Sequence, residues 1–137
     1  NEALYLDAAE RRYLEEAGSA NIFLVMKNGK FVVPESESIL PGVTRRSILT
    51  LAEDRLGLEV ERRPVDFRNE IENIDEFGAC GTAAVISPVG KVFIDERWHH
   101  FFGDGEEIGP VTEQLYDVLT RLQKGEEQDS YGWTIEV

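Results

Sequence analysis

The sequence predicts a mixed α+β domain from three features. An apolar run at Ile22–Met26 is followed by Asn28-Gly29, the dipeptide most typical of a two-residue hairpin turn, and then by a returning strand at Lys30–Val33. Apolar residues recur at helical spacing over about Arg45–Leu56 and again near the C-terminal end. The predicted strands outnumber the predicted helices, and hairpins are prominent among them.

Local signals define the first elements. Ala3–Leu6 suits a short strand, and Asp7 with Glu10 three residues later resembles a capping box, which starts either a helix or a single turn. Pro34 ends the returning strand of the hairpin.

The first long helix is predicted over about Arg45–Leu56, with Thr44 as its natural N-cap and Gly57 as the residue after its last turn. Leu58–Arg63 alternates apolar and charged residues, which predicts a half-buried strand that Pro64 closes. The apolar stripe of the helix is Ile48, Leu49, Ala52 and Leu56.

The second half of the chain begins with a short helix predicted within Asp66–Asp75. Small residues throughout Phe77–Val89 predict one buried strand whose exposed backbone passes close to another group. Val92–Ile94 is a further strand, Pro110 opens the last helix at its N1 position, and Asp129–Val137 is a tail with a short extended end. The last helix carries the stripe Val111, Leu115, Val118, Leu119 and Leu122 and ends at Gly125.

Composition limits the class of protein. The 137 residues suffice for one domain, residues 1–137, and are too few for two ordinary ones. Lys and Arg number 14 against 27 Asp and Glu, and the net charge of −13 argues against binding to nucleic acid or to an anionic membrane, although backbone amides could still hold a small anion.

Other features concern the location of the protein. No apolar run approaches the roughly 20 residues that span a bilayer, and the first residues lack the features of a signal peptide. The single cysteine, Cys80, fits a reducing, cytoplasmic setting. Because the chain begins without Met, we expect that an upstream segment is missing.

Three short segments are candidates for ligand binding. Pro41–Thr44 is a turn that leads into a helix, where free N–H groups and the helix dipole favour a phosphate, although an ordinary N-cap explains the same residues. Cys80–Ala84 offers backbone N–H groups and the hydroxyl of Thr82, although tight packing of a central strand is the simpler explanation. Glu16 precedes a glycine and a buried strand and could face a cationic ring nitrogen, although most glutamates are solvated.

Other reactive residue types give weaker evidence for a functional site. His99 and His100 are adjacent and diverge on any regular element, so a surface loop without a metal site is the better interpretation. Cys80 has no basic neighbour in the sequence and is interpreted as a small buried residue. Nothing selects two of the many acidic residues as a glycosidase pair.

Taken together and in order, these segments resemble the C-terminal part of the branched-chain amino acid aminotransferases, which are class IV, or fold-type IV, pyridoxal-phosphate enzymes. The motifs are LYLDAAERRYLEEAGSANIF at Leu4–Phe23, ILPGVTRR at Ile39–Arg46, FGACGTAAVISPVGKV at Phe77–Val92 and YGWTIEV at Tyr131–Val137. Each is weak alone, and four in the correct order are specific. The resemblance implies a pseudo-barrel domain of mixed strands with flanking helices.

The resemblance also implies roles for single residues. Glu16 would pair with the ring nitrogen of pyridoxal 5'-phosphate, because its carboxylate would keep this nitrogen protonated. Gly42, Val43 and Thr44 would hold the cofactor phosphate at the helix N-terminus, with the hydroxyl of Thr82 beside them. The substrate carboxylate would lie near Ser19, Ala83 and Ala84.

One departure from the family pattern concerns the Schiff-base lysine, which the family places a few dozen residues before the glutamate equivalent to Glu16. Only 15 residues precede Glu16, and the lysines present are Lys27, Lys30, Lys91 and Lys124. None matches the family position, so no catalytic residue is assigned within this chain. We expect a fragment that binds the cofactor weakly or not at all and does not transaminate alone.

The complete enzyme would transfer the amino group of Leu, Ile or Val to 2-oxoglutarate as a cytoplasmic homodimer. Another class IV enzyme, a D-amino acid aminotransferase or an aminodeoxychorismate lyase, is an alternative that the Trp133–Val137 ending disfavours. The alternative from a different class is a non-catalytic acidic binding or assembly domain that kept the fold.

Overall fold

Strand β3 (Ala20–Met26), the apolar run identified in the sequence, is the centre of the main sheet. The structure is a computed structural model of the chain, and it describes residues 3–18, 20–36, 39, 43–81, 86–103 and 107–124. Within these residues the strands form one seven-stranded sheet and one two-stranded hairpin. The remaining strands are β1 Leu4–Leu6, β2 Leu14–Ala17, β4 Phe31–Pro34, β5 Val60–Arg63, β6 Ile74–Cys80, β7 Ile86–Pro88, β8 Lys91–Ile94 and β9 Arg97–His100.

The directions of the strands bring several of their ends together. β3 pairs antiparallel with β2, β4 and β6, and β4 pairs parallel with β5. β2, β4, β5 and β6 therefore run in the same direction. Their C-terminal ends lie at the end of the sheet where β3 begins, which we call the Asn21 end.

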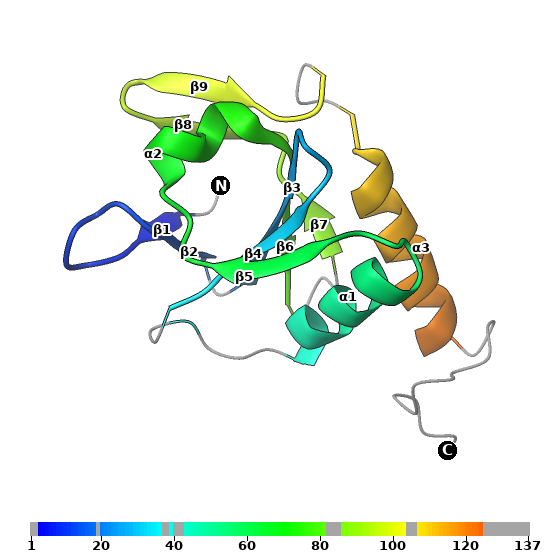
Figure 1. Cartoon of the computed structure of the whole chain (residues 1–137). Helices are drawn as coiled ribbons and strands as arrows, with labels where there is room; N and C mark the ends of the chain where they lie inside the picture. The colour runs from blue at the N-terminus through cyan, green and yellow to red at the C-terminus, as the bar shows by residue number, and fades with distance from the viewer. Residues whose placement is uncertain are drawn as a thin grey trace.

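The helices cover the two faces of this sheet. They are α1 Val43–Asp54, α2 Phe67–Glu70 with the short 3-10 turn η1 Ile71–Asn73, and α3 Pro110–Gln123. Figure 1 shows α1 and α3 on one side of the sheet and α2 with the β8–β9 hairpin on the other. The apolar stripes predicted for the two long helices are confirmed, because their residues pack in the core cluster against the sheet.

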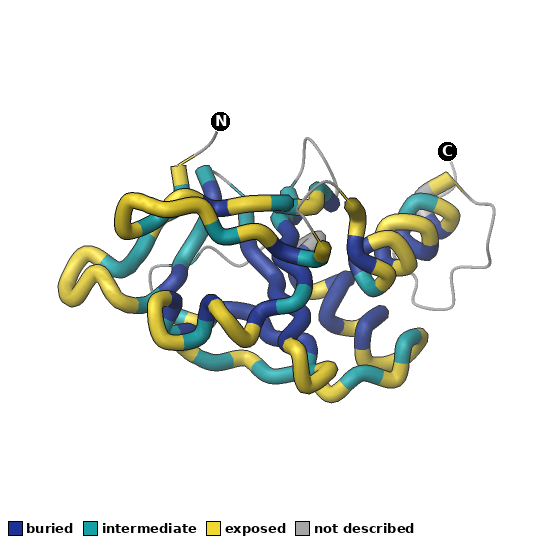
Figure 2. The backbone as a smooth tube through the Cα atoms, turned by 90° about the horizontal axis from the view of Figure 1, so that it is seen from above, coloured by how far each residue is buried: buried dark blue, intermediate teal, exposed yellow. Residues whose placement is uncertain are grey.

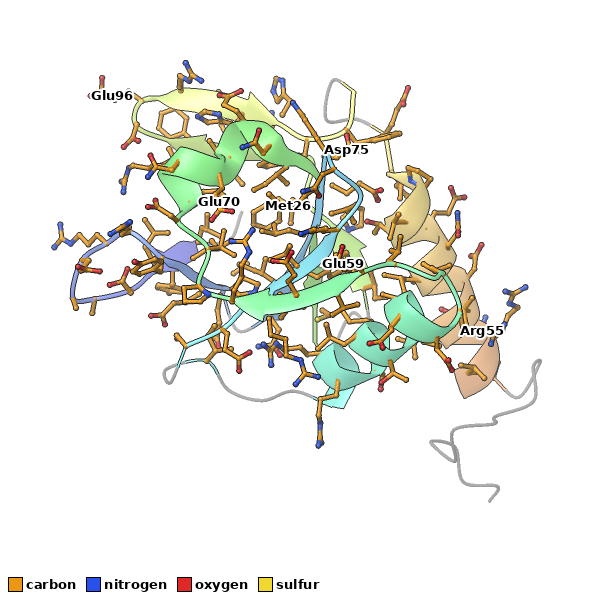
Figure 3. All side chains as sticks on the ribbon, in the orientation of Figure 1. Met26, Arg55, Glu59, Glu70, Asp75 and Glu96 are labelled. Carbon is orange, nitrogen blue, oxygen red and sulfur yellow. The ribbon has the colours of Figure 1, made fainter. Side chains whose placement is uncertain are left out.

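The sheet separates two apolar clusters, and the buried backbone in Figure 2 follows its central strands. In the cluster beneath α1 and α3, Phe23 stacks on Phe31 with ring centroids 5.4 Å apart. Met26 belongs to the opposite cluster, with Phe67 and Phe77, and lies near the centre of Figure 3. Alternation along β3 thus buries both of its faces.

The turns near the N-terminal end follow the predicted chemistry. Gly29 has φ +91°, and the Lys30 N–H donates to Oδ1 of Asn28 at 3.0 Å, so the hairpin turn is confirmed. Asp7 starts a single turn and no helix. Its carboxylate accepts N–H groups from three residues, and these hydrogen bonds lower its pKa.

Three expectations are corrected by the structure. α1 begins at Val43, so Thr44 lies inside its first turn and is not the N-cap. Phe77–Val89 is not one strand, because β6 and β7 pair antiparallel and the chain reverses between them; a run of small residues shows no period that would mark the reversal. His99 and His100 lie on β9, paired with β8, and not in a loop. The tail, including Trp133–Ile135, lies outside the described residues.

None of the helices in the part of the chain that the structure describes is both long enough and apolar enough to cross a membrane.

Candidate functional site

Glu16 occupies a row of side chains that crosses the sheet at the Asn21 end. It lies directly opposite Asn21 of β3, which lies directly opposite Cys80 of β6. Neighbouring strands are about 4.8 Å apart, so the row spans about 10 Å from Glu16 to Cys80. Opposite residues share a face of the sheet, and Cys80 belongs to the cluster beneath α1 and α3. The half-buried Glu16 is therefore on the face that α1 covers.

A β-bulge gives Glu16 this orientation. The register of β1 on β2 shifts by one residue, which leaves Glu15 as an extra residue between Leu14 and Glu16. Leu14 and Ala17 both pack in the cluster on the opposite face. Strict alternation from Leu14 would have turned Glu16 to that face as well.

The first turn of α1 lies at the same end of the sheet. It contains Val43 and Thr44, two of the residues predicted to bind phosphate, and it holds no acidic residue. The first N–H groups of a helix have no acceptor within the helix and carry the positive end of its dipole. Nη2 of Arg45 donates to the carbonyl oxygen of Pro34 at 3.0 Å, which anchors this turn to the end of β4.

The remaining predicted site residues are outside the described part of the chain. These are Ser19, Gly42, Thr82, Ala83 and Ala84. The structure does show that β6 delivers the chain to Cys80 and Gly81 at the Asn21 end. The roles proposed for the five residues remain predictions.

Cys80 is a small buried side chain, as expected. It is 1% exposed, and burial raises the pKa of its thiol to about 12. A thiol with this pKa is almost entirely protonated at neutral pH and is a poor nucleophile. Its contribution to the site is to hold the end of β6 in the core.

Two buried charged residues were missed by the sequence interpretation. Arg45 is 8% exposed and Glu76 is 2% exposed, although both residue types are normally at the surface. A signal for each was present. Arg45-Arg46 opens a helix, where the dipole disfavours cations, and the helix after Gly109 begins without a capping side chain of its own.

Another group of titratable side chains lies away from this end, at the β8–β9 hairpin. Nδ1 of His99 lies 3.7 Å from Oε1 of Glu72, which also pairs with Arg97 at 3.0 Å. Within the described ranges, no group of three or more His, Cys, Asp or Glu side chains is arranged to hold a metal ion.

Comparisons with known proteins agree on one family. The branched-chain-amino-acid aminotransferase of Haemophilus influenzae is 44% identical over 137 residues, a match covering 99% of this chain and 39% of that protein. The probable branched-chain-amino-acid aminotransferase of Staphylococcus epidermidis is 46% identical over 144 residues, a match covering 100% of this chain and 39% of that protein. The chain thus spans 39% of the length of these relatives.

Solved structures show the same likeness. The branched-chain amino acid aminotransferase of Escherichia coli superposes with a TM-score of 0.79 at 35% identity, covering 96% of this chain and 41% of that one. The holo-form of the branched-chain amino acid aminotransferase of Thermobaculum terrenum has a TM-score of 0.74 at 33% identity, covering 92% of this chain and 38% of that one. The sequence pattern of the family described as amino-transferase class IV matches residues 1–92, more than half of the 137 residues. The chain therefore belongs to the class IV aminotransferase family.

Proposed function

We propose that this chain is the cofactor-binding part of a pyridoxal-phosphate-dependent branched-chain amino acid transaminase, with residues 1–137 as one domain. The whole enzyme would pass the amino group of Leu, Ile or Val to 2-oxoglutarate. The supporting observation is the arrangement of Glu16 and the first turn of α1 at one end and on one face of the sheet. The names of the relatives support the choice of substrate.

The residues at the Asn21 end fit the charge pattern of the cofactor. Pyridoxal 5'-phosphate has a phosphate at one side of its ring and a protonated ring nitrogen at another. The helix end beside Arg45 attracts an anion, and the carboxylate of Glu16 attracts a cation. Both lie on the face that α1 covers.

Each group of this chain would have a defined task. When bound, the cofactor supplies an electron sink for chemistry at the α-carbon of an amino acid. The Glu16 carboxylate would accept a hydrogen bond from the ring nitrogen and keep the proton there. The backbone N–H groups of Gly42, Val43 and Thr44, with the hydroxyl of Thr82, would hold the phosphate. The substrate carboxylate would bind near Ser19, Ala83 and Ala84.

The lysines of the hairpin turn are too remote for covalent attachment of the cofactor. β3 is seven residues long, so Lys27 is about 20 Å from its Asn21 end. Lys30 lies in the same turn and pairs with Glu61 at 2.7 Å. Lys91 sits over the ring of Trp98 in the other hairpin, 4.6 Å from its centroid. These three lysines are thus away from the Asn21 end. The fourth, Lys124, is exposed at the end of α3 and does not match the family position of the Schiff-base lysine, which supports the proposal that the chain by itself does not transaminate.

The setting proposed is the cytoplasm, and the assembly proposed is a homodimer. The buried, unpaired Cys80 suits a reducing compartment. β1, β5 and β7 lie at the margins of the main sheet, and exposed strand edges favour pairing with another chain.

Replacing Glu16 with glutamine tests the proposed role of its carboxylate. Glu16→Gln is expected to weaken binding of pyridoxamine 5'-phosphate by about tenfold, because a charge-assisted hydrogen bond to the ring nitrogen is lost. Calorimetric titration of the full chain measures this affinity. Inorganic phosphate, which has no ring, should bind no more weakly than to the unsubstituted chain.

Glu15→Gln is the matched control, because it removes the same charge one residue away. Its affinity for pyridoxamine 5'-phosphate should stay within about twofold of the starting value. Equal losses in the two variants would point to net charge alone and contradict the role of Glu16. We propose weak binding by this chain alone, so an unsubstituted chain that binds neither compound would contradict the cofactor site.

A further inference from the structure

The guanidinium of Arg45 is buried, and it forms no ion pair with another described residue. Its Nη2 donates to the Pro34 carbonyl oxygen, and its Nε has no hydrogen-bond partner in the described part of the chain. Burial lowers the pKa of Arg45, the charge of the exposed Glu35 acts in the opposite direction, and the positive charge of Arg62 lowers it further. A buried cation is normally paired, because its desolvation is costly.

The side chain of Arg45 extends toward the N-terminus of α1. Arg45 is the third residue of the helix, and helical side chains lean back toward the N-terminal end. Its hydrogen bond reaches the end of β4, and its charge interacts with Cys80 at the end of β6. The positive charge is therefore next to the first turn of α1 and at the Asn21 end of the sheet.

The two long helices differ in what their N-termini face. The first turn of α3 receives the buried carboxylate of Glu76, which accepts the N–H groups of Val111 and Thr112. The first turn of α1 contains Arg45 and Arg46 and no acidic residue. The helix dipole disfavours both arginines there, although 27 acidic residues are available in the chain. An anion that binds this turn would balance both the positive end of the helix dipole and the charge of Arg45.

We propose that Arg45 is a positioning residue that provides the buried counter-charge for a phosphate group at the first turn of α1. The inference rests on the proposed function, since it deepens the phosphate site of that proposal. The ligand class is a phosphate dianion, carried by a phosphate ester of a pyridine ring or by free phosphate. Arg45 acts through its field and by holding the turn against β4.

Substitution of Arg45 with methionine tests this, with Arg46→Met as the matched control. Arg46 is the next residue of the helix, has the same charge and is exposed. Inorganic phosphate and pyridoxamine 5'-phosphate are titrated separately into the full chain at pH 5 and pH 8. We expect Arg45→Met to bind both about tenfold more weakly at pH 8, and Arg46→Met to stay within about threefold of the unsubstituted chain.

The pH profile separates a charge effect from a packing effect. A phosphate ester becomes a dianion above its second pKa of about 6, and inorganic phosphate does so at a somewhat higher pH, so the affinity of both for the unsubstituted chain should rise from pH 5 to pH 8. The rise should be much smaller in Arg45→Met and recovered in Arg45→Lys. An unchanged rise in Arg45→Met would overturn the proposal. The proposal would also be overturned if Arg45→Met bound pyridoxamine 5'-phosphate more weakly but bound inorganic phosphate as well as the unsubstituted chain does.

Stability without ligand provides the second readout. Removing a buried charge that has no ion pair offsets the loss of its hydrogen bond to the Pro34 carbonyl, so in the absence of phosphate Arg45→Met should unfold at a urea concentration close to that of the unsubstituted chain. It should lose the added stability that phosphate gives. A methionine variant that does not fold would overturn the inference, because Arg45 would then serve the fold.

The outcomes also separate this inference from the proposed function. If the unsubstituted chain and Arg45→Met bind both compounds equally well, only the role of Arg45 falls. If the unsubstituted chain binds neither compound, both the proposed cofactor site and the role of Arg45 are contradicted.

Discussion

Replacement of Glu76 with alanine is expected to lower the free energy of unfolding by about 3 kcal/mol. Oε1 of Glu76 accepts the backbone N–H of Thr112 at 2.9 Å and its hydroxyl at 2.8 Å, and Oε2 accepts the N–H of Val111 at 3.2 Å. The N-cap residue Gly109 makes no side-chain cap, so a carboxylate from β6 performs the capping across the core. Alanine would leave these buried donors without an acceptor. Urea denaturation followed by circular dichroism measures the loss.

Glu113 provides the control for the charge near this helix end. It lies in the first turn of α3 and is exposed, so Glu113→Ala should change stability by about 0.5 kcal/mol or less. Glu76→Gln keeps the shape of the side chain and one acceptor oxygen, so its loss of stability should lie between those of Glu76→Ala and Glu113→Ala. If Glu76→Ala and Glu113→Ala were equally stable, the buried cap would be unimportant.

The second large effect is expected at Gly78, where alanine should destabilise the fold by about 3 kcal/mol. Gly78 is directly opposite Phe23, and a Cβ on Gly78 would overlap the Phe23 ring. The ring cannot move aside easily, because Phe23 is fully buried and stacks on Phe31. A β-strand glycine covered by an opposing aromatic ring is a recurrent stabilising arrangement. Thermal and urea unfolding both measure the change.

Gly81→Ala is the control from the same segment of chain. Its Cβ would lie 3.7 Å from the nearest side-chain atom, Cβ of Ala20, which is ordinary contact, so its effect should be about 0.5 kcal/mol or less. Combining Gly78→Ala with Phe23→Leu should cost less than the sum of the two single changes, because the smaller side chain relieves the overlap. Simple additivity would show that the ring is not the cause.

The sequence was sufficient for most elements of the fold. The hairpin around Asn28-Gly29 and the apolar stripes of the two long helices are local patterns, and the structure contains them where they were expected. The reversal between β6 and β7 could not be predicted, because small residues on both sides of it hide the turn. The start of α1 was placed two residues late, because Thr44 is a common N-cap residue that lies within this helix.

The site was predictable in part. Glu16 and the first residues of α1 were singled out by residue type and by resemblance, but the face on which Glu16 lies depends on the bulge at Glu15, which alternation does not reveal. The buried positions of Arg45 and Glu76 depend on contacts between elements distant in the sequence, such as β6 with the first turn of α3. Sequence periodicity contains no information about such contacts.

The measurement that tests the central claim most directly is a map of amide chemical shifts as pyridoxamine 5'-phosphate is added to the full chain. If the cofactor site is formed by Glu16 and the first turn of α1, the largest changes will occur at Glu16, Val43, Thr44 and Cys80, with none at the Lys27–Lys30 turn at the other end of β3. Changes centred on that turn or on the β8–β9 hairpin, or no changes in a folded chain at saturating concentration, would contradict it.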